Sequence, residues 1–352
     1  MNKVAFYISA PALGGVEKVF LTYANEMADI GYDVSFIMCH DAPLGNLISP
    51  KVKVVNFQLS RARKSIAPLR RLMKKEEYDV IVCSNVQTLF VIIARLGIKV
   101  KTKIVSSQHF YCSNVETPSY YKYLLRFIYS NCDLVLSVSE GIEGELRKVL
   151  HVSPDKVVIL KNPINRKEIL SLADENVSVP NGKLIVWVGR MYQVKNLPLL
   201  LTAFSKVLQV HDDASLILVG DGDCKQDLLN QCEELGISDR VIFEGIQTNP
   251  YKYLSKANVV ALSSSSEAYP TVLLEALALG KTIVSTPTGG AKEILNDGQY
   301  GYLSEDFSVE KYAHAIEMAL DQPMEPSLLV SESMNSDVMA VTLSFCRLLD
   351  SF

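Results

Sequence analysis

Short apolar runs alternate with longer amphipathic stretches along the whole chain. In the first half, the runs KVAFYIS, YDVSFIM, VKVVNF, YDVIVCS, TKIVSSQH, DLVLSVS and KVVILKN predict strands with helical segments between them. After the loop DENVSVPNG the same order restarts with KLIVWVG, SLILVG, RVIFEG, NVVALSS and KTIVST. Strands of this kind are typical of parallel sheets that are covered on both faces. The pattern therefore predicts an α/β protein with two tandem Rossmann-like, doubly wound parallel-sheet domains.

The repeat places a domain boundary near the middle of the 352-residue chain. We expect a first domain over residues 1–162 and a second over 163–335, with a hinge near 160–164. A last helical stretch, about 336–352, could pack back on the first domain. Ligands of doubly wound sheets bind at the carboxyl ends of the strands, so two sheets that face each other would enclose the site in a central cleft.

Composition narrows the class of protein. The formal charge is −4 and no nucleic-acid motif is present, so nucleic acid is not an expected partner. The seven cysteines are scattered without a CxxC pair, which favours core residues in a reducing compartment over disulfides or metal ligands. The N-terminal run is too short for a signal peptide, and no apolar run reaches the length of a membrane span. These features predict a cytoplasmic protein.

Two turns at predicted strand ends carry candidate anion-binding residues. In PALGGVEK, Gly14 and Gly15 directly precede a helix, where glycines allow close backbone approach and the helix N-terminus favours an anion. In GRMYQVKN, Arg190 and Lys195 follow the first strand of the second half, and two cations there suit a diphosphate. The alternatives are a plain tight turn for the glycines and a solvated loop for the cations.

The segment SEAYPTVLLEALALG places one carboxylate before a helix and a second inside it. Pro270 fits the first helical turn, and Thr271 and Val272 then offer free backbone amides to an anion. The Glu275 side chain should lean toward the N-terminus, where it can accept hydrogen bonds from the vicinal hydroxyls of a ribose. Glu267 could reach a group beyond the phosphates. Alternatively, Glu275 pairs with a basic residue in the core and Glu267 simply lies near the cap.

Together these residues resemble a known enzyme family. SSSSEAYPTVLLEALALGKTIVSTPTGGAKEIL is similar to the E-x7-E segment of the glycosyltransferase family 4 enzymes of bacterial cell-surface glycan type. GGVEK, VGRMYQVKN, LVGDGDCKQDL, FEGIQTN and NDGQYGYL fall in the family's order. The resemblance covers nearly the whole chain, is strongest over 184–303 and is thin beyond about 320. It implies the GT-B fold, with an acceptor-side first domain and a nucleotide-sugar donor domain second.

The resemblance also implies roles for individual residues. Arg190 and Lys195 would neutralise the leaving diphosphate, while Glu267 would face the transferred sugar and Glu275 the ribose hydroxyls. His109, which closes the strand TKIVSSQH, matches a histidine that reaches the sugar. The catalytic candidates are therefore Glu267, His109, Arg190 and Lys195. The donor-binding candidates are Gly14, Gly15, Arg190, Lys195, Glu267, Ala268, Tyr269, Pro270, Thr271, Val272 and Glu275. Ala268 departs from the family pattern, which has glycine there, and adds a Cβ beside the sugar.

The expected reaction is a retaining transfer of a hexose or N-acetylhexosamine to a glycan. The donor is a nucleotide-diphosphate sugar, with UDP favoured and GDP next, and no metal or cofactor is required. Retention could come from same-face attack or from a covalent intermediate, for which Glu267 is the candidate nucleophile. Two other classes use the same donor site: a sugar-nucleotide epimerase on the same fold and a catalytically silent sugar-nucleotide-binding subunit.

One short motif points to a rival fold. DGD, at 221–223, imitates the Asp-x-Asp metal motif of the other large transferase fold, which predicts a metal-dependent single-domain enzyme. Because the triplet lies inside the second repeated βα pattern, we interpret it as a tight turn.

Two basic segments suggest where the acceptor comes from. Residues 61–75 and 120–130 combine cations with apolar or aromatic side chains, a pattern that suits an anionic membrane surface. These helices would hold the enzyme peripherally on the cytoplasmic face of the inner membrane, beside a lipid-linked acceptor. The alternative is an ordinary helix with a core face and a solvated basic face.

Overall fold

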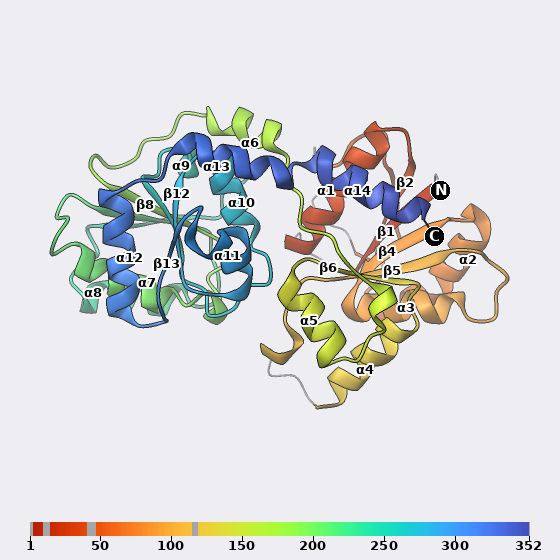
Figure 1. The fold of residues 1–352 in the computed structure, drawn as a ribbon. Helices are drawn as coiled ribbons and strands as arrows, with labels where there is room; N and C mark the ends of the chain where they lie inside the picture. The colour runs from red at the N-terminus through yellow and green to blue at the C-terminus, as the bar shows by residue number, and fades with distance from the viewer. Residues whose placement is uncertain (1–2, 10–14, 41–46, 115–118, 352) are drawn as a thin grey trace. The chain divides into compact units, whose positions relative to one another are not determined.

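The chain forms two compact units, each built on one parallel sheet (Figure 1). A computed structural model describes residues 3–9, 15–40, 47–114 and 119–351. The first unit comprises Met1–Ile164 and Val338–Phe352, and the second comprises Asn165–Asp337. The division comes after Ile164, where the sequence pattern placed it after residue 162.

The first unit contains a seven-stranded parallel sheet in the order β3-β2-β1-β4-β5-β6-β7. The pairing is in register, with Val4 of the first strand opposite Val34 on one side and Val80 on the other. The strands are β1 (Lys3–Ile8), β2 (Asp33–Met38), β3 (Lys53–Asn56), β4 (Val80–Ser84), β5 (Lys103–Gln108), β6 (Leu134–Ser137) and β7 (Val157–Ile159).

Helices cover both faces of this sheet. They are α1 (Gly15–Asp29), α2 (Ile66–Glu76), α3 (Asn85–Arg95), α4 (Ser119–Ser130), α5 (Glu140–Lys148) and α14 (Val338–Asp350). On one face, α1 and α14 pack together, with the rings of Tyr23 and Phe345 5.2 Å apart. On the other, Tyr7 Oη lies 2.7 Å from Ser65 Oγ at the start of α2. The last helix therefore belongs to the first unit, where the sequence pattern allowed it to return.

The second unit contains a six-stranded parallel sheet in the order β10-β9-β8-β11-β12-β13. Its strands are β8 (Leu184–Val188), β9 (Ser215–Val219), β10 (Val241–Gly245), β11 (Val259–Leu262), β12 (Thr282–Ser285) and β13 (Tyr302–Leu303). Its helices are α6 (Arg166–Ala173), α7 (Leu197–Val207), α8 (Lys225–Glu234), α9 (Tyr251–Leu254), α10 (Thr271–Ala278), α11 (Gly289–Ile294), α12 (Val309–Asp321) and α13 (Pro326–Ser333).

Apolar side chains from the strands and their helices form the core of each unit. Phe6, Phe36 and Phe345 are fully buried in the first unit, and Trp187 and Phe204 are fully buried in the second. Burial of such side chains supplies most of the favourable free energy of folding. The doubly wound arrangement predicted from the apolar runs is confirmed.

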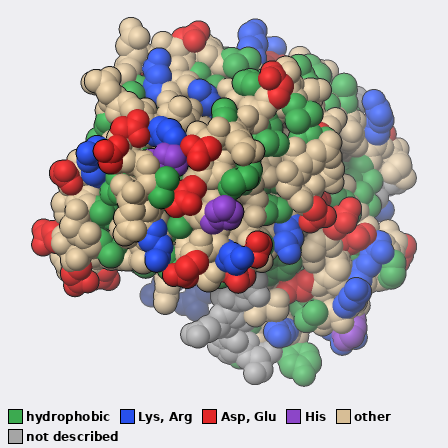
Figure 2. Space-filling model, turned by 60° about the vertical axis from the view of Figure 1, so that its left-hand side comes forward, with side chains coloured by type: hydrophobic (Ala, Val, Ile, Leu, Met, Phe, Trp, Pro, Cys, Tyr) green, Lys and Arg blue, Asp and Glu red, His purple; other side chains and the backbone are tan. Residues whose placement is uncertain are grey.

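Charge on the surface is mixed. On the face drawn in Figure 2, acidic and basic side chains are interspersed, in keeping with the small formal charge of −4. Within the described part of the chain, none of the helices is both long and apolar enough to cross a bilayer.

Candidate active site

The strand order fixes where a ligand of the second unit binds. β8 and β11 are neighbours in the sheet, yet the strands that follow each of them lie on opposite sides of this pair. At such a switch point the loops after the two strands diverge and leave a crevice at the carboxyl edge. The loop after β8 carries Arg190 and Lys195, and the loop after β11 carries Glu267.

These two loops are joined by an ion pair. Lys195 Nζ lies 2.6 Å from Glu267 Oε1, and Ser264 Oγ donates a hydrogen bond of 2.6 Å to the same oxygen. The Lys195 side chain is 27% exposed and that of Glu267 is 13% exposed, so both charges are partly removed from water. Within the described chain Glu267 Oε2 has no recorded hydrogen bond, so its lone pairs can accept one from a ligand hydroxyl.

Backbone contacts hold the same loops in place. The Ser265 amide donates to the Val194 carbonyl over 2.9 Å, and Ser263 Oγ donates to the Lys195 carbonyl over 2.8 Å. The Gly290 amide donates to the Glu267 carbonyl over 3.0 Å. A Cβ on Gly290 would lie 2.4 Å from the Ala268 carbonyl oxygen, so only glycine lets the helix α11 approach this closely. The Lys195–Glu267 pair is therefore positioned by its surroundings.

The loop that carries Arg190 packs against the turn after β9. Gly220 adopts a φ of +138°, and a Cβ there would overlap the Gly189 carbonyl. Asp221 accepts hydrogen bonds from the Gly222 amide (2.8 Å) and from Lys225 (3.2 Å), which together lower the pKa of its carboxyl group. The DGD triplet therefore forms a tight turn, and this turn packs against the loop that carries the exposed Arg190.

Helix α10 begins one residue later than its sequence pattern predicts. Pro270 has extended backbone angles and is the N-cap, so it precedes the first helical turn instead of occupying it. Thr271 and Val272 form the half-buried first turn, and Glu275 is also half-buried. Tyr251 Oη lies 3.5 Å from Glu275 Oε1. The Glu275 charge and burial both raise the pKa of Tyr251.

The loop that leads into α10 is closely packed. Ala268 and Tyr269 are both buried, and the Ala268 carbonyl is the group that approaches Gly290. The Cβ that distinguishes Ala268 from glycine is therefore accommodated among protein atoms.

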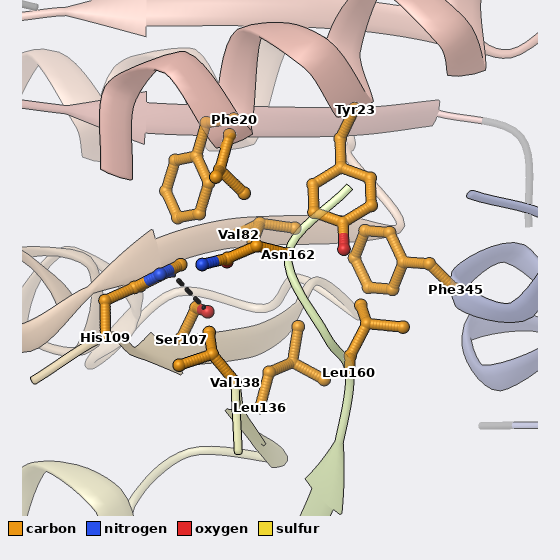
Figure 3. A pocket seen from close by; sticks show the side chains of 11 residues that line it. Phe20, Tyr23, Val82, Ser107, His109, Leu136, Val138, Leu160, Asn162 and Phe345 are labelled. Carbon is orange, nitrogen blue, oxygen red and sulfur yellow. Dashed lines mark hydrogen bonds between the residues drawn. The ribbon is translucent and has the colours of Figure 1, made fainter. Parts of the chain in front are cut away.

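His109 lies in the first unit, at the carboxyl end of β5. Its Nε2 is 2.8 Å from Ser107 Oγ, and its ring meets Phe20 at a centroid distance of 6.1 Å. His109 is one of the residues that line a cavity of about 10 Å³, together with Asn162 and Phe345. Figure 3 shows these side chains. Desolvation lowers the pKa of His109 to about 4, so the ring is neutral at neutral pH.

The glycine turn is only partly described. Gly15 is the first residue of α1 and is exposed, and a Cβ there would meet none of the described atoms within 4 Å. Gly14 lies outside the described residues. Among the candidates, the structure brings Lys195 together with Glu267 in the second unit, while His109 and Gly15 belong to the first.

Three polar residues that contact these candidates were not predicted from the sequence. Ser264 contacts Glu267, Tyr251 contacts Glu275, and Ser107 contacts His109. The run SSSS before Glu267 is a signal that could have indicated Ser264. Tyr251 comes from a short helix 24 positions before Glu275, so no local spacing pointed to it.

Family comparisons match both halves of the chain. Residues 13–168 match the model described as Glycosyltransferase Family 4, and residues 171–333 match the model described as Glycosyl transferases group 1. Together the two matches span most of both units.

Individual relatives extend over most of the chain. One Campylobacter jejuni protein is 28% identical over 87% of this chain and 86% of its own length. It is named N-acetylgalactosamine-N,N'-diacetylbacillosaminyl-diphospho-undecaprenol 4-alpha-N-acetylgalactosaminyltransferase. An Escherichia coli protein, UDP-Gal:alpha-D-GlcNAc-diphosphoundecaprenol alpha-1,3-galactosyltransferase, is 23% identical over 91% of this chain and 88% of its own.

Solved structures share the fold. The Anabaena protein HepE, in complex with UDP and glucose, superposes with a TM-score of 0.84 at 19% identity and covers 100% of both chains. Because the matched relatives are named as transferases, the epimerase and silent-subunit classes lose support. The chain therefore belongs to the glycosyltransferase family 4 enzymes, with a group 1 domain as its second unit, and is a glycosyltransferase of the GT-B fold.

Proposed function

We propose that the enzyme moves a hexose or N-acetylhexosamine from a UDP-sugar to a lipid-linked glycan, with retention at the anomeric carbon. GDP-sugars are the next candidate donors. The observation that carries this proposal is the Lys195–Glu267 pair at the crevice between β8 and β11. It puts a cation for a diphosphate and a carboxylate for sugar hydroxyls within one hydrogen bond of each other.

The chemical step uses these charges on the leaving group. As the bond from the anomeric carbon to the diphosphate breaks, negative charge grows on the phosphate oxygens, and Arg190 and Lys195 offset it. The acceptor oxygen forms its bond on the same face, and a leaving phosphate oxygen takes the acceptor proton. Glu267 accepts a hydrogen bond from a sugar hydroxyl through Oε2, while Glu275 accepts hydrogen bonds from the ribose hydroxyls.

The geometry around Glu267 favours a binding role over a nucleophilic one. Lys195 and Ser264 both occupy Oε1, which holds the carboxylate in place and stabilises its negative charge. A nucleophile must give up that charge to a carbon atom, and these two contacts oppose the change. We therefore prefer same-face attack to the covalent intermediate.

The names of the relatives support the choice of acceptor and donor. Two of them name an undecaprenol-linked diphosphate glycan, and one of those names UDP-Gal. HepE was solved with UDP and glucose. A lipid-linked acceptor would place this enzyme at the cytoplasmic face of the inner membrane in surface glycan assembly.

The first experiment measures donor binding and slow donor hydrolysis over UDP-, GDP- and ADP-sugars, with EDTA present. We expect one nucleotide sugar, a UDP-sugar, to bind without metal, and Glu275→Gln to lose most of that binding. Glu310→Gln is the matched control, because Glu310 is an exposed partner of a lysine in the same unit. Binding that requires a metal, or that is insensitive to Glu275, would refute the proposed site.

A further inference from the structure

Ser107 and His109 form a polar pair at the carboxyl end of β5. Ser107 is 5% exposed, and its Oγ lies 2.8 Å from Nε2 of His109. Side chains alternate between the two faces of an extended chain, so residues two positions apart lie on the same side. At this distance either the hydroxyl or the ring nitrogen can be the donor. Which of the two donates decides what the ring can do for a substrate.

The proton of the serine hydroxyl needs an acceptor. Among the described residues, the one recorded hydrogen bond of the Ser107 side chain is the contact with His109. If Nε2 carried the ring proton, it would donate to Oγ and leave the buried hydroxyl proton without an acceptor, which is unfavourable. If Ser107 donates instead, both atoms are satisfied. The contact therefore indicates that Nε2 is the acceptor.

The cavity beside the pair gives that proton little alternative. Its volume of about 10 Å³ is at the lower limit for one water molecule. Apolar side chains make up most of its lining, among them Val82, Leu136 and Leu160, which Figure 3 shows together with Ser107. Apolar cavities of this kind favour dry packing over a bound water. The His109 ring is therefore the acceptor that the fold provides.

The direction of this hydrogen bond determines where the ring proton lies. Desolvation lowers the pKa of His109 to about 4, so the ring is neutral at neutral pH, with one nitrogen protonated and the other accepting. Because Nε2 accepts from Ser107, the proton lies on Nδ1, which has no recorded hydrogen bond within the described chain. His109 is only half-buried, so a ligand can approach it. Such a ring donates a hydrogen bond and has no free lone pair with which to take a proton.

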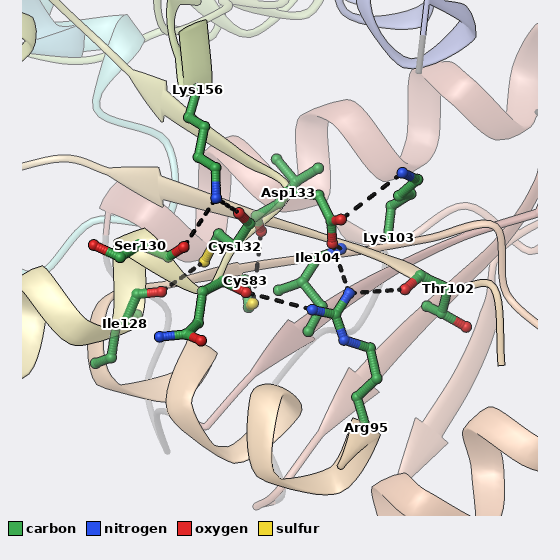
Figure 4. A network of polar contacts seen from close by, with 12 residues as sticks. Cys83, Arg95, Thr102, Lys103, Ile104, Ile128, Ser130, Cys132, Asp133 and Lys156 are labelled. Atoms are coloured by element: carbon green, nitrogen blue, oxygen red, sulfur yellow. Dashed lines mark hydrogen bonds and ion pairs between the residues drawn. The ribbon is translucent and has the colours of Figure 1, made fainter. Parts of the chain in front are cut away.

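The strand that carries the pair is held at its amino end by contacts that do not involve Ser107. The Ile104 amide donates to Asp133 Oδ2 over 2.8 Å, and Arg95 donates to the same oxygen over 2.6 Å (Figure 4). These bonds join β5 to the turn before β6 and to the end of α3. The backbone of β5 is therefore fixed without the serine hydroxyl.

The segment that follows His109 is anchored in the same way. The amides of Cys112 and Ser113 donate to the two carboxylate oxygens of Glu145, each over 2.7 Å, and Glu145 is buried. Hydrogen bonds to a charged group are stronger than those between neutral groups. Removal of the Ser107 hydroxyl should therefore release the His109 ring without moving the chain that carries it.

An Nδ1–H group beside apolar side chains suits an uncharged oxygen better than a phosphate, because the ring offers no charge. An N–H that donated to the attacking acceptor oxygen would make that oxygen a poorer nucleophile. The transferred sugar is therefore the better partner. This choice also agrees with a reaction in which a leaving phosphate oxygen takes the acceptor proton.

We propose that Ser107 is a positioning residue that holds His109 as the Nδ1–H tautomer, so that the ring donates a hydrogen bond to a hydroxyl oxygen of the transferred sugar and does not act as a base. The identity of this partner rests on the proposed function. The tautomer is a property of the unliganded protein and is measured separately.

The first test is histidine ¹⁵N NMR of the unliganded protein at about pH 7.5, where the shifts of the two ring nitrogens show which one is protonated. The His109 signals are those that disappear in His109→Leu. We expect the wild type to carry the proton on Nδ1. Ser107→Ala should move it toward Nε2, because no hydrogen bond then fixes Nε2 as the acceptor. Ser107→Thr, which retains a hydroxyl, should behave like the wild type.

Ser106→Ala is the matched control for this measurement. Ser106 is a buried serine of the same strand, and its hydroxyl lies 2.8 Å from Thr88 Oγ1 instead of contacting His109. The His109 tautomer should therefore be unchanged in this variant. A wild-type ring with its proton on Nε2, or a tautomer that Ser107→Ala leaves unchanged, would overturn the inference.

Nucleotide binding tests the contact with the sugar. We compare UDP with UDP-galactose, UDP-glucose and their N-acetyl forms. Ser107→Ala should weaken binding of the preferred UDP-sugar about fivefold and leave UDP binding unchanged, because one hydrogen bond to the sugar is lost. Ser107→Thr and Ser106→Ala should bind both like the wild type. In a His109→Leu background Ser107→Ala should have no further effect, since the two residues act through one contact.

The two measurements separate this inference from the proposed function. A wild-type protein that binds neither UDP nor a UDP-sugar would refute the proposed function, while the NMR result would still decide whether Ser107 sets the tautomer. Equal losses of UDP and UDP-sugar binding in Ser107→Ala, or no loss of either, would overturn the inference, because the ring would then have no specific contact with the sugar.

Discussion

The two units share a strand order over their first six strands but differ at the carboxyl edge. In the second unit the edge carries opposite charges in contact, with Lys195 and Glu267 2.6 Å apart. In the first unit the edge carries the neutral His109 ring beside an apolar cavity. The same scaffold therefore presents a charged site in one unit and an uncharged polar site in the other. The charged edge of the second unit suits a donor that carries a diphosphate.

Lys195→Met should produce the largest effect. In the proposed site Lys195 lies beside the leaving diphosphate, so loss of this preorganised cation should lower kcat of donor hydrolysis about 100-fold. Lys206→Met, which removes a lysine paired with Glu310 on the surface of the same unit, should leave kcat unchanged. If both variants hydrolyse the donor at the wild-type rate, the charged edge of the second unit does not contribute to the reaction.

His109 tests the uncharged edge of the first unit through the pH dependence of stability. Because its folded pKa is lowered to about 4, the unfolded chain binds a proton at a higher pH than the folded protein does. The neutral His109 ring should therefore contribute its full stabilisation above about pH 6.5. The free energy of unfolding should fall by about 2–3 kcal/mol as the pH drops toward 4. His109→Gln should flatten this part of the curve, as followed by urea unfolding of the first unit. If His109→Gln leaves the slope of stability against pH unchanged, the wild-type ring is exposed to water.

Gly290→Ala tests how much the charged edge depends on close packing. The added Cβ would lie 2.4 Å from the Ala268 carbonyl, so the loop before α10 must move, at a cost of about 1–3 kcal/mol. Gly144→Ala is the control in the first unit, since in α5 the new Cβ would meet no described atom within 4 Å apart from its own helix backbone and chain neighbours. There alanine should stabilise by about 0.4–1 kcal/mol. Thermal unfolding of both variants decides whether the contact at Gly290 matters.

Tyr251→Phe should give the smallest effect. Removing the hydroxyl near Glu275 leaves that carboxylate less well positioned, which should weaken binding of the proposed UDP-sugar donor about threefold to fivefold. Tyr253→Phe is the matched control, because the Tyr253 hydroxyl also donates a hydrogen bond to a glutamate, Glu244, over 2.8 Å. Equal donor affinity in the two variants would mean that the contact at Glu275 has no role in binding.

Much of the fold could be predicted from the apolar pattern of the sequence, but the candidate site could be predicted only in part. Buried parallel strands have continuous apolar runs, so their order along the chain could be read directly. The pairing of Lys195 with Glu267 joins residues 72 positions apart, and sequence spacing does not encode such contacts. The strand order that brings their loops together is itself a tertiary property. The contact between Tyr251 and Glu275 was missed for the same reason.

The two basic helices show a second limit of sequence patterns. Leu69 of α2 and Phe127 of α4 both lie in helices that combine basic and apolar residues, yet one is fully buried and the other is half exposed. Periodicity shows that a helix has an apolar side, but the neighbouring elements decide which residues remain outside. Pro270 illustrates the smaller uncertainty at helix ends, where the cap and the first turn differ by one residue.

The return of α14 to the first unit has a consequence for synthesis. Phe345 and Leu349 are fully buried in that unit's core, and the Val338 amide donates to the Ile164 carbonyl over 2.9 Å. On the ribosome, residues 165–337 emerge as one continuous segment before α14 is made. The second unit can thus complete its core first, although domains usually mature in the order of their synthesis. A nascent chain that stalls late would carry a finished second unit and a first unit with an open hydrophobic face, the kind of surface that chaperones cover.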